Sequence, residues 1–122
     1  MKSYTDLEQS KKLAEILPLE SADMRYAPIG DIHPWVWEGN PKLLETDSTP
    51  CWSLAALLDI LYQVKEIKHQ RVTILVGGFA GQQWYVEFVK VQDEKSVLLE
   101  HSKELVDACV EMILKLHELN LL

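Results

Sequence analysis

The apolar residues of the first segment recur at helical spacing and predict a helix from Thr5 to Leu17. Thr5 is expected to cap this helix, because Glu8 stands three residues later and completes a capping box. Pro18 cannot continue a helix, so the element should end just before it.

A second helix is predicted to begin at Thr49 and Pro50 and to run to about Lys65. Threonine is a favourable N-cap, and proline is tolerated at the first helical position because an N–H there lacks an intrahelical partner anyway. The apolar residues that follow form a wide face that a core could cover. Its leucines are Leu54, Leu57, Leu58 and Leu61.

A third helix is predicted to follow Ser102, which can cap it. Apolar residues occupy one side of this helix and charged residues the other, a pattern typical of a helix packed on a core. The apolar stripe consists of Leu105, Cys109, Met112, Ile113, Leu116 and Leu119.

Three strands are predicted between the last two helices. Arg71 to Val76 is a β-branched run, Trp84 to Val91 alternates between apolar and polar, and Ser96 to Glu100 is a third short strand. The glycine-rich run Gly77 to Gly81 and a polar segment separate them as turns. The pattern indicates an antiparallel meander.

The segment Leu19 to Ser48 shows no regular period. Four of the five prolines of the chain lie between Pro28 and Pro50. Because a long structureless loop is unusual in a compact domain, we expect short strands at Met24 to Ile29 and Trp35 to Glu38, placed at the sheet edge.

These elements predict one domain over residues 1–122 with an α+β fold. We expect two layers, in which an antiparallel sheet of three to five strands packs against two or three helices. The second and third helices should cover one face of the sheet, and the first should cover an edge or end.

Charge and composition exclude several functions. Lysine and arginine total 12 against 19 aspartates and glutamates, so the net charge of −7 disfavours nucleic-acid binding. No apolar run approaches the ~20 residues of a membrane span, and the first residues do not form a signal peptide. We therefore expect a cytoplasmic protein with free thiols at Cys51 and Cys109.

Cys51 is the first candidate for chemistry. It stands in the first turn of the second predicted helix, where the helix dipole would lower its pKa. The order Pro-Cys-Trp-Ser superficially resembles a cysteine-protease nucleophile, but no histidine motif supplies the base that such a nucleophile needs. A small buried residue is the better interpretation.

Asp59 is the second candidate, at the border of the apolar face of the same helix. A carboxylate in that position needs a partner, which we expect to be a backbone N–H of the irregular segment. The sequence has no zinc-ligand spacing, and Gly77 to Gly81 lacks the Lys-Ser/Thr of a phosphate loop. We therefore expect no metal and no cofactor.

Trp35 and Trp37 are the remaining candidates and share one side of a predicted strand. Aromatic residues in a proline-rich stretch can anchor a partner or a ligand. Packing of the irregular segment onto the core is the favoured interpretation, and an anchoring role stays open beside it.

Three stretches resemble a group of small uncharacterised proteins from gut Bacteroides and their prophage-like or conjugative elements. They are LAEILPLESADM at Leu13 to Met24, PCWSLAALLDIL at Pro50 to Leu61, and VDACVEMILKLHEL at Val106 to Leu119. The resemblance implies a bacterial cytosolic setting and no catalytic activity. Alanine is common in that group at the position of Cys51, which further disfavours a nucleophile.

The leading hypothesis is a non-enzymatic accessory or protein-interaction protein, with Trp35, Trp37, Cys51 and Asp59 as the candidate binding surface. It would act on an unidentified protein partner or as a homodimer, through the irregular segment or an exposed strand edge. The alternative is a small-molecule binder or enzyme whose site lies between the sheet and residues 19–48.

Overall fold

A computed structural model describes residues 1–26, 35–36, 48–79 and 83–122 of the chain. Its described residues form three α-helices, seven strands and one 3-10 turn. The helices are α1 (Leu7–Ala14), α2 (Leu54–Tyr62) and α3 (Leu105–Glu118), and the 3-10 turn is Leu19–Ser21. The strands are β1 (Met24–Tyr26), β2 (Trp35–Val36), β3 (Thr49–Cys51), β4 (Glu66–Ile67), β5 (Gln70–Phe79), β6 (Gln83–Lys90) and β7 (Ser96–Ser102).

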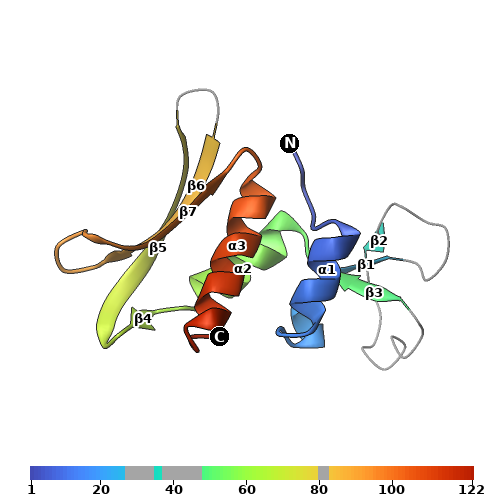
Figure 1. Cartoon of the computed structure of the whole chain (residues 1–122), viewed down its shortest axis with the longest axis horizontal. Helices are drawn as coiled ribbons and strands as arrows, with labels where there is room; N and C mark the ends of the chain where they lie inside the picture. The colour runs from blue at the N-terminus through green and yellow to red at the C-terminus, as the bar shows by residue number, and fades with distance from the viewer. Residues whose placement is uncertain (27–34, 37–47, 80–82) are drawn as a thin grey trace.

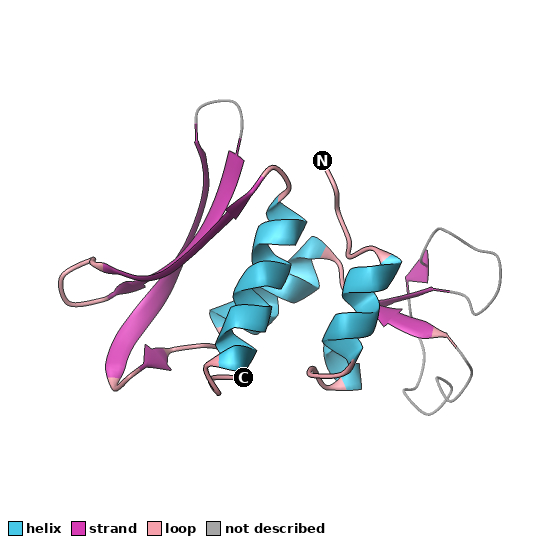
Figure 2. Cartoon of the chain, in the orientation of Figure 1, coloured by secondary structure: helices cyan, strands magenta, loops and turns pink. Residues whose placement is uncertain are grey.

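The predicted α+β fold with an antiparallel sheet packed against helices is confirmed. A four-stranded sheet in the order β4-β5-β6-β7 packs one face against α2 and α3 (Figure 1). On the other side of these helices lie α1 and a second antiparallel sheet, in the order β2-β1-β3 (Figure 2). The expected position of the first helix is wrong, because α1 contacts β3 and α3 instead of an edge of the large sheet.

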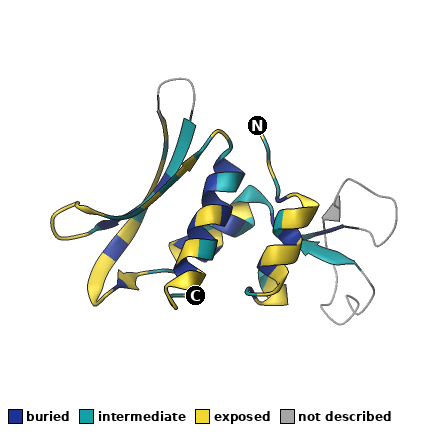
Figure 3. Cartoon of the chain, in the orientation of Figure 1, coloured by how far each residue is buried: buried dark blue, intermediate teal, exposed yellow. Residues whose placement is uncertain are grey.

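The core lies between the large sheet and the helix pair and extends to the α1 side, where it includes Leu13, Leu17 and Trp52 (Figure 3). Burial of apolar side chains is the dominant favourable contribution to folding, which explains why the patterned faces meet there. Of the predicted stripe on α3, only Leu119 is exposed. The largest fully buried side chains include Trp52, Phe88, Leu57, Leu61, Met112, Ile113 and Leu116.

The predicted meander is confirmed; β5 and β7 are longer than expected, and β6 has the expected length but begins one residue earlier. The β5 and β6 strands pair continuously from Val72 opposite Lys90 to Phe79 opposite Gln83. The turn predicted at Gly77 to Gly81 is wrong at its start, because Gly77 and Gly78 still belong to β5. Phe79 also belongs to β5, and the last two residues of the predicted turn, 80 and 81, lie outside the described residues.

Close packing explains one of the two glycines in β5, Gly77, whereas a side chain at Gly78 would make only ordinary contacts. A methyl group added to Gly77 would lie 2.8 Å from the ring of Tyr85, its partner on β6. A methyl group on Gly78 would lie 3.7 Å from the ring of Trp84, which is its own partner. Each glycine therefore lies beneath an aromatic ring of the neighbouring strand.

The start of α1 differs from the sequence prediction. Asp6, not Thr5, is the N-cap, and its carboxylate accepts a hydrogen bond from the backbone N–H of Gln9 at 2.8 Å. The Gln9 side chain completes the capping box by accepting from the Asp6 backbone N–H. Thr5 is fully buried and contributes its hydroxyl to an internal network instead.

The start of the second helix is also corrected. Thr49 and Pro50 belong to β3 and pair with β1, so they do not open α2. Ser53 is the cap, and its hydroxyl accepts from the Ala56 backbone N–H at 3.2 Å. The third helix likewise starts later than expected, because Ser102 ends β7 and Glu104 occupies the N-cap position of α3.

The strands expected in the irregular segment are present in its described part, but they do not extend the large sheet. Met24–Tyr26 and Trp35–Val36 pair with each other, and the former also pairs with β3. The three helices separate this small sheet from the four-stranded one (Figure 1).

We predict that Ser53→Ala lowers the free energy of unfolding by about 1–2 kcal/mol. The change removes the cap of α2 and the hydrogen bond that the Ser53 hydroxyl donates to the Asp23 carboxylate. Urea unfolding of the purified chain measures the loss. Thr49→Ala is the control and should cost less; the reverse order would contradict this assignment of the cap.

Candidate functional site

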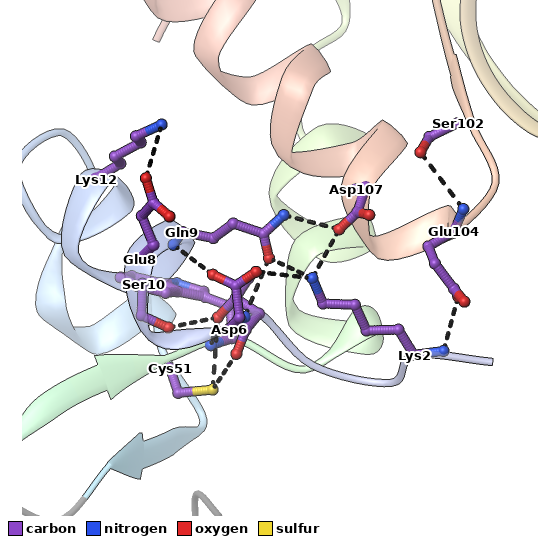
Figure 4. Close-up of polar contacts among 12 residues, drawn as sticks. Lys2, Asp6, Glu8, Gln9, Ser10, Lys12, Cys51, Ser102, Glu104 and Asp107 are labelled. Carbon is purple, nitrogen blue, oxygen red and sulfur yellow. Dashed lines mark hydrogen bonds and ion pairs between the residues drawn. The ribbon is translucent and has the colours of Figure 1, made fainter. Parts of the chain in front are cut away.

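Cys51 belongs to a buried polar network beneath α1 (Figure 4). Its side chain is fully buried, and its Sγ lies 3.5 Å from the Thr5 hydroxyl and 3.4 Å from the Thr5 carbonyl oxygen. The Thr5 hydroxyl also lies 2.7 Å from that of Ser10 and accepts from the Trp52 backbone N–H. The network joins β3 to the segment that leads into α1.

The chemistry of Cys51 follows from these surroundings. Burial raises the pKa of its thiol, and the neighbouring hydroxyls of Thr5, Ser10 and Tyr26 only partly oppose this effect. The residue ends β3, so the helix-dipole argument for a lowered pKa was wrong. A protonated, inaccessible thiol is a poor nucleophile. The buried structural role that the sequence favoured for Cys51 matches this geometry.

A second polar cluster fastens the N-terminal segment to α3 and is called the N-terminal clasp here (Figure 4). The Lys2 ammonium donates to Asp107 at 2.8 Å, to Gln9 at 2.8 Å and to Asp6 at 3.1 Å. The Lys2 backbone N–H donates to the Glu104 carboxylate at 2.8 Å. Because the polar groups of the clasp hydrogen-bond to one another, we interpret the clasp as a structural contact.

Neighbouring charges and hydrogen bonds shift the pKa values of Lys2 and Asp6 in the clasp. Partial burial alone would lower the pKa of Lys2, but the hydrogen bonds and charges of Asp107 and Asp6 outweigh it and raise that pKa. Burial would likewise raise the pKa of Asp6, yet the Gln9 backbone N–H and the Lys2 ammonium lower it. Both shifts favour the charged forms that the clasp uses.

Asp59 does not have the environment expected from the sequence. It is exposed and accepts a hydrogen bond from its neighbour Gln63 at 3.3 Å, rather than from a backbone N–H of the irregular segment. It lines an open cleft of about 670 Å³ between the segment after α1, the end of α2 with the residues that follow it, and the residues after α3. The apolar residues that line the cleft include Leu17, Pro18, Ile60, Val64 and Leu121.

The predicted binding residues do not gather at one site in the described structure. Trp35 is in β2, opposite Arg25, and Trp37 lies outside the described residues. Cys51 is buried beneath α1, whereas Asp59 is exposed on α2. Within the described ranges, no three acidic, histidine or cysteine side chains are placed to hold a metal ion. No described helix is long and apolar enough to cross a membrane.

The open edge of β5 was not identified from the sequence. The two-residue strand β4 pairs only with Gln70 and Arg71, so no described strand lies beside residues 72–79 on that side. The Val72 N–H bonds the Lys65 carbonyl on the β4 side, and the Arg71 carbonyl accepts from Val91 on the β6 side. Since these directions alternate along a strand, the backbone groups of Ile74, Val76 and Gly78 face the open edge.

This edge lacks two features by which proteins often protect a terminal strand, charge and proline. No charged residue and no proline occurs from Val72 to Phe79. Val76 is 40% exposed, although it lies on the sheet face that carries core residues further along. The opposite edge strand, β7, carries Glu100 and pairs with β6 through an irregular register at Phe88 and Val89. The β7 edge therefore has a charge and an irregular register, whereas the open part of the β5 edge has no charge and no proline.

The outer face of the sheet is uncovered beside this edge. Leu75 on β5 and Leu99 on β7 flank Glu87 in one cross-strand row, and each leucine is nearly half exposed. The signal in the sequence was a long β-branched and glycine run without a charge. It indicated a strand but could not show that the strand lies at the end of its sheet.

Comparisons with protein-family models, with curated proteins and with solved structures find no match to this chain.

We predict that neither native thiol reacts with a maleimide or a disulfide reagent while the chain is folded. Burial raises the pKa of Cys51, and that of Cys109 to about 12. Modification at pH 7 should follow the rate of unfolding and become fast in denaturant. Rapid labelling of Cys51 in the native state would restore it as a candidate nucleophile.

We also predict a pH-dependent effect of Asp6→Asn. Because the pKa of Asp6 is lowered in the folded chain, its charge stabilises the fold above the unfolded pKa of about 3.9, and this contribution disappears as the pH falls through the folded value. The variant should be less stable than the parent at pH 7, and the difference should shrink below about pH 4. Thermal unfolding from pH 2 to pH 7 measures it; a difference independent of pH would contradict the clasp.

Proposed function

We propose that this chain is a non-enzymatic protein-interaction module that binds an extended strand at the open edge of β5. The observation that carries the proposal is the uncharged run from Val72 to Phe79, which pairs with β6 on one side and has no described strand on the other. An added strand bonds backbone groups that a sheet edge otherwise leaves to solvent.

The backbone direction along β5 defines how such a strand would bind. Ile74, Val76 and Gly78 supply alternate N–H donors and C=O acceptors on the open side. Gly78 is exposed and has no side chain, which lets another backbone approach closely there. Main-chain bonds provide affinity, and the neighbouring side chains of both faces provide selectivity.

The buried cysteines support the non-enzymatic part of the proposal. Both thiols are fully buried, and the Cys51 network contains hydroxyl and carbonyl groups without an imidazole. The charged groups of the N-terminal clasp are bonded to one another. Neither cluster presents an activated nucleophile or base to solvent.

The cleft beside Asp59 supports a second candidate function, the binding of a small molecule. Its volume of about 670 Å³ lies within the range of ligand pockets. Its polar rim, however, consists of surface groups such as Glu20, Asp59 and Glu66. Ligand sites usually combine apolar walls with a few convergent polar groups, so strand binding at β5 is the better supported function.

The test is a fluorescent peptide with the sequence of residues 71–79, N-methylated at its Thr73, Leu75 and Gly77 positions. The methyl groups block one edge of the peptide, so that it can pair only through the other. We expect saturable binding to the wild-type chain, measured by fluorescence anisotropy at a protein concentration below any self-association.

Val76→Pro should abolish this binding. Proline removes an N–H that faces the open edge, so the pairing of β5 with β6 remains. Val76→Thr is the matched control, because it keeps the N–H and a β-branched side chain. Circular dichroism should show that both variants are folded. Equal binding by Val76→Pro, or no binding by the wild type, would overturn the proposed function.

A further inference from the structure

We propose that the strand accepted by β5 is β5 of a second copy of this chain, paired antiparallel about a two-fold axis through Val76. The inference rests on the proposed function and names the partner of the same edge. The inference starts from the sizes of the side chains along β5. When two antiparallel copies of the strand are centred on Val76, the large side chains of one copy lie opposite the small residues of the other.

A two-fold axis at Val76 sets large residues against glycines. Ile74 of one copy stands opposite Gly78 of the other, Leu75 stands opposite Gly77, and Val76 stands opposite itself. The backbone groups of Ile74, Val76 and Gly78 face the open edge, so the Ile74–Gly78 and Val76–Val76 pairs are hydrogen-bonded and the Leu75–Gly77 pairs are not. The arrangement would form about six new backbone hydrogen bonds.

The aromatic residues of β6 complete this match on both faces of the sheet. The ring of Tyr85 lies over Gly77, and the ring of Trp84 lies close to Gly78. Leu75 of the second copy would therefore meet Tyr85 on the outer face, while Ile74 of that copy would meet Trp84 on the other. Each contact occurs twice by symmetry, as an isologous interface requires.

Other positions of the axis fit less well. An axis at Leu75 pairs Leu75 with itself and loses its contact with Gly77. An axis nearer Gln70 brings the second strand against β4, which already bonds Gln70 and Arg71. An axis nearer Phe79 leaves few strand residues before β5 ends.

A second copy would also provide hydrogen-bond partners for the open backbone groups of β5 without starting a filament. Both β5 edges are consumed in one closed pair, and the outermost strands become the two β7 strands, which carry Glu100 and the irregular register. Each chain has a net charge of −7, while residues 72–79 are uncharged. Added salt should therefore strengthen the pairing of two like-charged copies, whereas it would weaken the binding of a basic partner.

Sedimentation equilibrium of the full chain tests the inference. We expect a monomer–dimer equilibrium that tightens from 50 mM to 500 mM NaCl. Val76→Pro should weaken it by about tenfold or more, because it removes hydrogen bonds at the centre of the interface. Val76→Thr should associate like the wild type. Association that Val76→Pro leaves unchanged would place the contact elsewhere and overturn the inference.

Crosslinking tests the position of the axis. A cysteine introduced by Val76→Cys would lie next to its symmetry mate, about 5.5 Å away between Cα atoms, and a short bismaleimide should link the two chains. The native cysteines are fully buried and should not react. Val91→Cys is the control, because Val91 is 53% exposed and lies outside β5. Equal crosslinking at both positions would indicate random collision and overturn the inference.

The peptide experiment separates this inference from the proposed function. If the chain stays monomeric at every concentration while the peptide binds, strand addition stands and the second copy is excluded as the partner. If neither the peptide nor a second copy binds, both proposals are overturned.

Discussion

The burial of one face of α3 is the interaction on which the other elements depend. This helix packs against β6 and β7, lies beside α2 and also contacts α1, which in turn contacts β3 of the small sheet. Met112, Ile113 and Leu116 are fully buried in that position. Burying such side chains stabilises a fold by roughly 1.5–3 kcal/mol each. The N-terminal clasp then fastens the start of the chain to Glu104 and Asp107 at the beginning of the same helix.

The same arrangement leaves part of the sheet without a neighbour. The helices cover one face, and β4 is too short to pair with more than two residues of β5. Residues 72–79 consequently combine strand pairing on one side with an open edge on the other. Since soluble proteins usually place charge or proline on such an edge, the uncharged run is the least expected feature of the described surface.

Local patterns along the chain predicted the elements better than their boundaries. The meander and the stripe of α3 were correct because alternation and the 3.6-residue period extend over many residues there. The starts of the helices were not, since Thr5, Thr49 and Ser102 all have side chains that can cap a helix. Whether a hydroxyl caps a helix depends on its neighbours, and Thr5 is instead buried against Ser10 and Cys51. Asp59 was misplaced for the same reason, because a residue at the border of an apolar face becomes buried only if another element covers it.

The sequence by itself determined the fold class, the strands from Arg71 onward, the apolar face of α3 and the lack of a recognisable catalytic motif. These properties depend on composition and on residues close together in the chain. Only the tertiary structure decided that Thr49–Cys51 is a strand, that the irregular segment contributes to a second sheet, and that β5 lies beside an open edge. Each of these depends on contacts between segments far apart in the sequence. The order of strands in a sheet, which exposes Val76 at an edge, is not encoded in any local pattern.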